Sequence, residues 1–465
     1  MQSRIDPAFF NHAFIGLWSW VVRAKCRQIL WPGANACPFL PPLSGCRVSS
    51  FLLRAGGSYS SLLFRVVAVF MIRLAIVRQK YNPAGGAERF VSRALNALRE
   101  HGELDLHLIA RRWEKLEGVT AHPASPFYLG NVWRDWGFAR AAKRIWLRER
   151  FDLVQSHERI PGCDVYRAGD GVHRQWLTLR ARRMSWLRRL SLSLNPYHRY
   201  ICSTESEMFL HPRLRLVICN SMMVKREIID YFGLPESRIV VIYNGVDLNA
   251  FHPSLRQTHR QSMRQEWGIA ESAPLLLYVG SGFDRKGVAR ALRAAAKQSE
   301  AHLMIVGGDK RIERYRSLAR RLGMEARVRF AGPRQDVKPF YGMADGFILP
   351  TLYDPFPNVC IEALASGLPI LTTKQCGGAE LVRQGWNGWV CDALDESALS
   401  SQIGEWLSLR SRWADLSEAA RRSAEPLSME VMGARLLSCY RELLGAEGLD
   451  MGRSASASAG EERSQ

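Results

Sequence analysis

The chain of 465 residues lacks the long hydrophobic run that a membrane-spanning helix needs. Such a helix takes about 20 consecutive apolar residues, and the longest apolar stretches here are interrupted by Arg23, Arg65 and Arg73. A secretory signal peptide fits poorly, because Asp6 lies where the segment should be basic and no small-residue cleavage site closes an apolar run. We therefore expect a protein without a transmembrane segment.

The sequence also lacks the spacings that bind a structural metal. None of its ten cysteines forms a CxxC pair, and none has a histidine at zinc-site spacing. Several cysteines lie in apolar, strand-like runs, where a thiol behaves as a small hydrophobic group. These features predict free thiols in a reducing, cytosolic compartment.

Acidic residues are scarce relative to basic ones. There are 44 Asp and Glu against 64 Lys and Arg, which gives a net charge of +20. This excess points to an anionic partner: nucleic acid, a phospholipid surface or a phosphorylated substrate. With 47% hydrophobic and 23% charged residues the composition is that of a globular protein, and the length suits about two domains.

From Met71 onward, short apolar runs alternate with amphipathic stretches of helix length. The predicted strands are Ile72–Val77, Asp105–Ala110, Asp152–Gln155, Leu216–Cys219 and Val240–Tyr243, then Leu275–Val279, Leu303–Val306, Val328–Ala331, Gly346–Leu349 and Ile370–Thr372. Continuous apolar strands separated by helices are typical of parallel sheets covered on both faces. We predict an α/β fold of two facing, doubly wound, Rossmann-like domains, with ligands at the carboxyl ends of the strands in the cleft between them.

Breaks in this pattern divide the chain into segments. Residues 1–70 carry seven basic residues against one acid and have no sustained periodicity, so we expect an N-terminal extension outside the fold. The polar stretch Asn244–Ala273 separates the two strand series, giving a first domain over 71–243 and a second over 244–430. We expect a C-terminal helix over 431–451 that packs back on the first domain, and a disordered tail over 452–465.

Two carboxylates eight positions apart, Asp354 and Glu362, follow the predicted strand Gly346–Leu349. A Pro-Phe-Pro turn comes after the first, and a short predicted helix carries the second. A carboxylate can accept hydrogen bonds from both hydroxyls of a ribose, and loop amides can contact a sugar or a phosphate. Each acid taken alone could be a solvated helix residue, but the whole segment predicts a binding site.

Two glycine-containing loops each join a predicted strand to a helix. In the second domain, Arg285 and Lys286 stand side by side in such a loop, a forked donor and a point charge that suit a diphosphate. The alternative is a solvated basic loop. In the first domain, Gly85 and Gly86 could let the backbone approach a ligand, or could serve packing alone. Neither loop is a GxGxxG or Walker motif.

The basic loop 285–286, the carboxylate pair and the Gly377-Gly378 turn together resemble the retaining glycosyltransferases of family 4, which have the GT-B fold. The resemblance covers about residues 71–445. The signature of that family is two glutamates separated by seven residues, and in this chain Asp354 stands in the first place and Glu362 in the second.

The resemblance implies roles for the residues that match. Glu362 would bind the ribose of a nucleotide-sugar donor, Asp354 would lie beside the donor sugar, and Arg285 and Lys286 would neutralise the departing diphosphate. The other donor-binding residues that it implies are Gly85, Gly86, Arg334, Asn358, Val359 and Cys360. It implies no metal and no other cofactor, the nucleotide sugar being a substrate.

Within that family, the segments Gly280–Val288 and Pro161–Asp170 resemble hexosyltransferases of the lipopolysaccharide core. The likeness implies that Asp170 contacts the acceptor hydroxyl; a turn-capping aspartate is the alternative. It implies transfer of a hexose, glucose from UDP-glucose, to a heptose of the inner core. Two further interpretations stay open: a transferase of the same fold that extends another lipid-linked or capsular glycan from a different nucleotide sugar, and a non-catalytic lipid- or nucleic-acid-binding protein.

Much of the positive charge lies in Arg134–Tyr200. Within it, His173–Tyr200 holds seven arginines and no acid, interleaved with Trp176, Trp186 and leucines. Through Leu190 this segment could form one basic helix lying in a membrane interface, or a packed helix with a solvated face. No nucleic-acid motif accompanies it. We expect a cytoplasmic enzyme, peripheral on the anionic inner face of the cytoplasmic membrane, without a nucleic-acid partner.

Overall fold

The computed structural model describes residues 72–80, 104–113, 118–182 and 184–461, with side chains as far as residue 445. The predicted extension over 1–70 lies outside the described residues. In this part of the chain the cysteines are free thiols, and no helix has both the length and the apolar character that crossing a bilayer takes.

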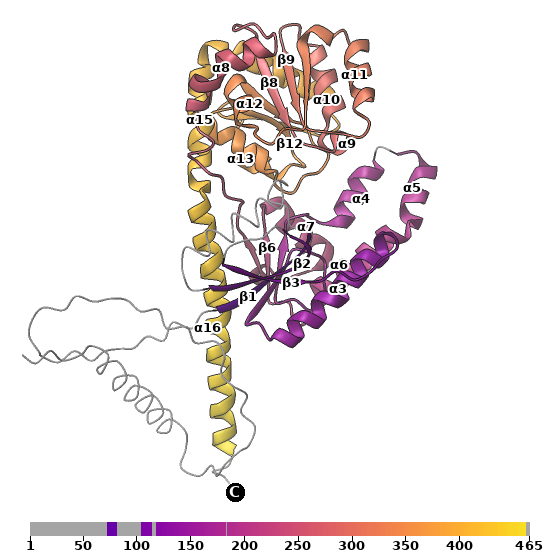
Figure 1. Cartoon of the computed structure of the whole chain (residues 1–465), viewed down its shortest axis with the longest axis vertical. Coiled ribbons are helices and arrows are strands. Elements are labelled where there is room, and N and C mark those ends of the chain that lie inside the picture. Colours follow the sequence, from indigo (N-terminus) through magenta and orange to yellow (C-terminus); the bar gives the residue numbers. More distant parts are fainter. Residues whose placement is uncertain (1–71, 81–103, 114–117, 183, 462–465) are drawn as a thin grey trace, which may run out of the picture. The chain divides into compact units, whose positions relative to one another are not determined.

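The first domain is built on a parallel sheet with the strand order β3-β2-β1-β4-β5-β6-β7 (Figure 1). Its strands are β1 (Ile72–Lys80), β2 (Leu104–Arg112), β3 (Val119–Pro123), β4 (Leu153–Ser156), β5 (Val165–Ala168), β6 (Leu216–Cys219) and β7 (Ile239–Val241). Two of them escape prediction from sequence: β3 is short and has no buried residue, and β5 carries a buried arginine among four residues.

The second domain is built on another parallel sheet, with the order β10-β9-β8-β11-β12-β13. Its strands are β8 (Leu275–Val279), β9 (His302–Val306), β10 (Val328–Gly332), β11 (Gly346–Leu349), β12 (Ile370–Thr373) and β13 (Gly388–Cys391). Strands β8, β11 and β12 are buried along their whole length, as expected of a sheet covered on both faces. The predicted α/β fold of two Rossmann-like domains is confirmed.

Helices connect the strands and cover the sheets (Figure 1). In the first domain they are α3 (Gly130–Glu149), α4 (His173–Ala181), α5 (Trp186–Leu194), α6 (Pro196–Leu210) and α7 (Met222–Phe232). After it come α8 (Ser254–Glu266), α9 (Phe283–Lys286), α10 (Val288–Ala296), α11 (Ile312–Arg321), α12 (Lys338–Met343), α13 (Asn358–Ala365), α14 (Glu396–Ser408), α15 (Trp413–Ala424) and α16 (Met429–Glu461).

The basic segment that begins at His173 is two helices, so the expectation of one helix through Leu190 is wrong. Helix α4 ends at Ala181, and α5 begins only after Ser185, whose backbone is extended. The two helices meet different surroundings: α4 buries Leu179 against Leu352 and Tyr353 of the second domain, whereas α5 has no buried residue.

The C-terminal helix α16 packs on the first sheet although it follows the second domain. Met432, Leu436, Leu437 and Tyr440 share one core cluster with residues of β1, β2, β4, β5 and β6. The Tyr440 hydroxyl donates a 2.8 Å hydrogen bond to Gln155 Oε1. The helical backbone of α16 continues to Glu461, and the disorder expected over 452–465 stays a prediction.

We expect the packing of α16 to stabilise the first domain. Leu436→Ala removes a buried side chain (1% exposed) and should lower the free energy of unfolding by about 2–5 kcal/mol. Val431→Ala, on the exposed side of the same helix, should change it by less than about 0.5 kcal/mol. Urea denaturation of both variants measures the difference; equal losses would show that α16 does not depend on this contact.

Candidate active site between the two sheets

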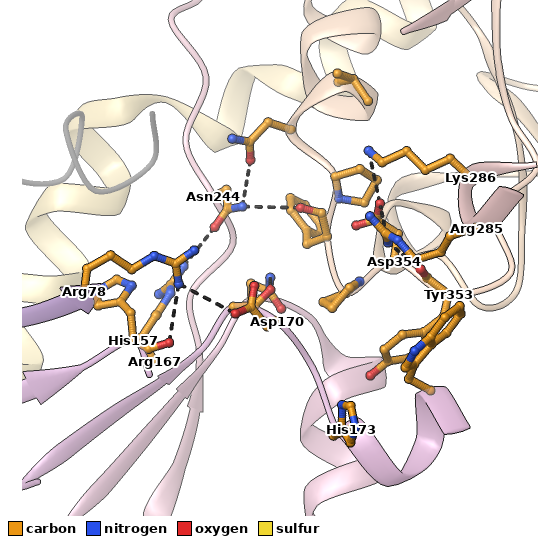
Figure 2. Close-up of a pocket in the computed structure, with 18 of the residues that line it drawn as sticks. Arg78, His157, Arg167, Asp170, His173, Asn244, Arg285, Lys286, Tyr353 and Asp354 are labelled. Carbon is orange, nitrogen blue, oxygen red and sulfur yellow. Dashed lines mark hydrogen bonds and ion pairs between the residues drawn. The ribbon is translucent and has the colours of Figure 1, made fainter. Parts of the chain in front are cut away.

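A cavity of about 380 Å³ lies where the carboxyl ends of the two sheets meet (Figure 2). The first domain lines it with Arg78, His157, Arg159, Arg167, Gly169, Asp170, His173, Trp176, Asn220 and Asn244. The second lines it with Arg285, Lys286, Tyr353–Val359 and Glu362. This is the position at which open α/β sheets bind ligands.

Two cations and one carboxylate form the centre of the second-domain wall. Arg285 and Lys286 end the short helix α9, and Asp354 lies in the loop between β11 and α13. Arg285 Nη1 and Lys286 Nζ each lie 3.3 Å from Asp354 Oδ2 (Figure 2). The aspartate thus holds two positive charges side by side at the mouth of a Gly-rich turn, the arrangement that a diphosphate requires.

The backbone fixes this arrangement through two glycines that no other residue could replace. A Cβ on Gly287, whose φ is +88°, would lie 2.0 Å from the Pro350 carbonyl oxygen, and one on Gly377 would lie 1.8 Å from that of Pro355. The amide of Gly377 donates a 2.9 Å hydrogen bond to the carbonyl oxygen of Asp354. The β11–α13 loop is therefore held between the segment at Gly287 and the segment at Gly377.

Glu362 lies beneath the same wall on α13, with 2% of its surface exposed. Its Oε2 accepts a 3.2 Å hydrogen bond from the Tyr341 hydroxyl. Asn358 and Val359 begin the helix, so their amides lie at its positive end. This wall therefore offers a fixed carboxylate, amides and two cations to a single ligand.

The facing wall belongs to the first domain and carries a more exposed carboxylate. Asp170 follows β5, its side chain is 47% exposed, and its Oδ2 lies 3.6 Å from Arg78 Nη1. Burial, with help from Arg78, lowers the pKa of His157 well below its usual value. Burial and nearby Arg159 lower that of His173 to about 4. Both imidazoles are thus neutral near pH 7.

Three links join the two walls. Asn244, which follows β7, accepts a bond from Arg167 Nη2 (2.9 Å) and donates from Nδ2 to Asn358 Oδ1 (2.7 Å). Glu380 of the second domain accepts hydrogen bonds from the first two amides of α7, at 2.9 and 2.6 Å. Such a carboxylate at a helix N-terminus satisfies otherwise unpaired donors.

The third link is Tyr353, whose hydroxyl accepts a 2.9 Å bond from the Val172 amide and donates a 2.6 Å bond to Glu227 Oε2. Glu227 lies on α7, which begins at the Ser221 cap and ends at Gly233 in the left-handed region. Burial raises the pKa of Glu227 to about 7, the bond from Tyr353 opposing the rise.

The structure brings together most of the residues that the sequence singled out. Asp170, Arg285, Lys286, Asp354, Asn358, Val359 and Glu362 all line the cavity. Arg334 and Cys360 do not: the Arg334 guanidinium lies over the Trp267 ring, and Cys360 is fully buried. Gly85 and Gly86 lie outside the described residues.

Sequence reasoning missed several residues of the cavity: Arg78, His157, Arg167, His173, Asn244 and Tyr353. Arg78, His157, Asn244 and Tyr353 lie within or shortly after β1, β4, β7 and β11, so a search along the carboxyl ends of the predicted strands could have nominated them. Arg167 and His173 lie in and after β5, a strand that the sequence pattern does not predict. In the part of the chain that the structure describes, no three His, Cys, Asp or Glu side chains are grouped to hold a metal ion.

Comparison with known proteins places both domains in one enzyme class. A family model described as Glycosyltransferase Family 4 matches residues 84–250, and one described as Glycosyl transferases group 1 matches residues 259–423. Together they include every strand of the two sheets except β1, which precedes residue 84.

Two curated relatives act on lipopolysaccharide. The chain is 28% identical over 275 residues to the lipopolysaccharide glucosyltransferase WaaG of Escherichia coli, a match that covers 57% of this chain and 71% of the relative. It is 29% identical over 178 residues to the lipopolysaccharide core biosynthesis glycosyltransferase LpsE of Rhizobium meliloti, covering 38% of this chain and 51% of the relative. The chain therefore spans about half the length of LpsE.

Solved structures share the fold. The crystal structure of WaaG superposes with a TM-score of 0.67 at 24% identity, over 78% of this chain and 98% of that one. Anabaena Alr3699/HepE in complex with UDP-glucose superposes with a TM-score of 0.59 at 20% identity, over 81% of this chain and 100% of that one. At these identities the superpositions establish the common fold.

The raised pKa of Glu227 predicts how stability depends on pH. Between pH 4.5, its ordinary pKa, and about 7, the folded chain keeps the proton that the unfolded chain has lost. The free energy of unfolding therefore falls as pH rises through this window, by about 3 kcal/mol from this group, and levels off above pH 7. Glu227→Gln abolishes the titration, so its stability relative to wild type should grow between pH 5 and pH 8. Denaturation at both pH values measures this; a constant difference would contradict the assignment.

Proposed function

Since the chain belongs to the family 4 glycosyltransferases, we propose that it transfers glucose from UDP-glucose to a heptose of the lipopolysaccharide inner core, with retention of configuration. The observation that carries the proposal is the pair of cations held by Asp354 across one cavity from Asp170. Two relatives of lipopolysaccharide synthesis support the choice of acceptor. Family membership, with the cations and Glu362 in place, speaks against the non-catalytic alternative.

The donor is held by the second domain. Glu362 accepts hydrogen bonds from the ribose hydroxyls, and the amides that begin α13 contact the diphosphate or the sugar. Arg285 and Lys286 stabilise the negative charge that develops on the diphosphate as the bond between the sugar C1 and the β-phosphate oxygen breaks. Because these two cations supply that positive charge, the reaction needs no metal ion.

The acceptor is held by the first domain. Asp170 accepts a hydrogen bond from the acceptor hydroxyl and orients its oxygen toward C1. The new bond forms on the face that the diphosphate leaves, and the proton of the hydroxyl passes to the departing phosphate oxygen. No strong protein base is required, and the lowered pKa values of His157 and His173 make both imidazoles weak bases.

A screen of nucleotide sugars, read as nucleotide release, tests the proposal. We expect release from UDP-glucose, stimulated by deacylated core oligosaccharide and insensitive to EDTA. Lys286→Ala should lower kcat by about 10²–10³-fold, because it removes a charge that acts in the transition state. Glu362→Ala should raise the donor KM by about 10–100-fold, because it removes a charged hydrogen-bond acceptor.

Lys338→Ala is the matched control, since Lys338 begins α12 outside the cavity and should leave the rate unchanged. Wild-type rates in both site variants would contradict the proposal. Release from a GDP-sugar, or stimulation by a capsular glycan alone, would assign the site to the alternative transferase. Loss of activity in EDTA that Mg²⁺ or Mn²⁺ restores would overturn the metal-free mechanism.

We also propose that the enzyme docks on the anionic inner face of the cytoplasmic membrane through α5 and α3. Trp186, Leu190 and Leu194 stand four residues apart on α5, with 71%, 51% and 61% of their surface exposed. Trp133 and Trp136 are exposed on α3, and α6 contacts both helices. Arginines and lysines flank these side chains, and His173–Tyr200 contains no acid. An apolar face bordered by cations suits an anionic bilayer.

Vesicle binding tests this surface. The chain should co-sediment with vesicles rich in anionic lipid and much less with phosphatidylcholine, and binding should weaken as salt rises. Trp186→Ala with Leu190→Ala should lower the binding at least tenfold, since two exposed anchors are lost. Trp386→Ala removes a partly exposed tryptophan of the second domain and should have no effect. Equal binding to neutral and anionic vesicles would contradict the proposal.

A further inference from the structure

We propose that Tyr353 is a positioning residue that couples the donor half of the active site to the acceptor half, a role that rests on the glycosyl transfer proposed above. It immediately precedes Asp354, and its two polar ends contact different domains. Its backbone carbonyl accepts a hydrogen bond from Arg285, and its hydroxyl accepts one from the amide of Val172, next to the loop that carries Asp170.

The donor side depends on the Tyr353 backbone. Its carbonyl oxygen accepts a 2.7 Å hydrogen bond from Arg285 Nη1, the same nitrogen that lies 3.3 Å from Asp354 Oδ2. The guanidinium is thereby held in one orientation although 38% of the side chain is exposed. Because Tyr353 and Asp354 are consecutive, a displacement of this backbone would move both acceptors of Arg285, the Tyr353 carbonyl and the Asp354 carboxylate, together.

The acceptor side depends on the Tyr353 side chain, which enters the first domain and is 3% exposed. Its hydroxyl binds the amide of Val172, two residues after Asp170. Between them, Gly171 has a φ of +67°, and a Cβ there would lie 2.2 Å from the hydroxyl and 2.7 Å from Pro355 Cγ. The Asp170 loop is therefore shaped around a side chain that comes from the other domain.

Glu227 holds the hydroxyl in place from the opposite side, at 2.6 Å. The titratable and charged groups around it are Glu205 of α6, Arg226 and Asp230 of α7, Cys219 of β6, Glu380 of the segment Gly377–Leu381 and Tyr353 itself. With a pKa near 7, Glu227 is ionised at higher pH, and a hydrogen bond to an ionised carboxylate is stronger than one to a neutral carboxyl. The link should therefore tighten as pH rises through 7.

Loss of the Tyr353 hydroxyl should affect donor binding and acceptor orientation differently. Donor binding uses residues of the second domain, so the affinity for UDP should survive. The Asp170 loop loses a partner of its backbone, so the acceptor is less well oriented and kcat falls. A residue with a purely structural role would lower stability and leave kcat at moderate temperature unchanged.

Hydrogen exchange and kinetics on three variants of the full chain test the proposal. In Tyr353→Phe, the amide of Val172 should exchange at least tenfold faster and kcat should fall about ten- to a hundredfold, with the Kd for UDP within twofold of wild type. Glu227→Leu removes the acceptor of the Tyr353 hydroxyl, so it should show the same faster exchange at Val172, the same fall in kcat and the same unchanged Kd for UDP as Tyr353→Phe. Glu227→Gln keeps an acceptor oxygen, so it should retain the protection and most of kcat. In the wild type we expect kcat to rise through pH 7 as the link tightens, and in Glu227→Gln, which cannot ionise, this rise should be absent.

Two results would overturn the coupling: unchanged exchange at Val172 in Tyr353→Phe, or faster exchange with kcat within twofold of wild type. If Tyr353→Phe does not fold, the Glu227 pair decides by the same criteria. Wild-type protein that releases nucleotide from no donor would instead defeat the glycosyl transfer. The exchange experiment, which needs no turnover, still reports whether Tyr353 holds the loop.

Discussion

The ion pairs of Asp354 with Arg285 and Lys286 are the interaction on which the rest of the site depends. Two cations 3.3 Å from one carboxylate oxygen keep their side chains in place before any ligand arrives. An anionic ligand then meets preorganised charge, so little reorganisation accompanies catalysis. Gly287, which follows α9, and Gly377, which follows β12, let the chain approach the carbonyl oxygens of Pro350 and Pro355 in the β11–α13 loop closely.

The segments that follow β11 and β12 also contact the first domain. Tyr353, Asn358 and Glu380 each contact the first domain through a hydrogen bond, and all three lie after strands of the second sheet. The donor cations and the Asp170 loop are thus connected by a few short covalent and hydrogen-bonded steps. Basic and aromatic side chains on α3 and α5 lie outside this set.

Sequence reasoning could find the sheets and the centre of the site because both follow local rules. Apolar runs such as Leu275–Val279 indicate buried strands, and charged residues after them indicate the ligand edge. Contacts between distant segments have no local signal: nothing around Tyr353 reveals that its hydroxyl reaches Val172. The packing of Leu179 of α4 against Leu352, which is equally distant in sequence, likewise has no local signal.

A crystal structure of the chain with UDP tests the central claim most directly. The account predicts β-phosphate oxygens within about 2.8 Å of Lys286 Nζ and of the Arg285 guanidinium, the usual length of a charge-assisted hydrogen bond. It also predicts ribose hydroxyls on the Glu362 carboxylate. A diphosphate bound elsewhere, with Asp354 still the only acidic partner of the two cations, would contradict it.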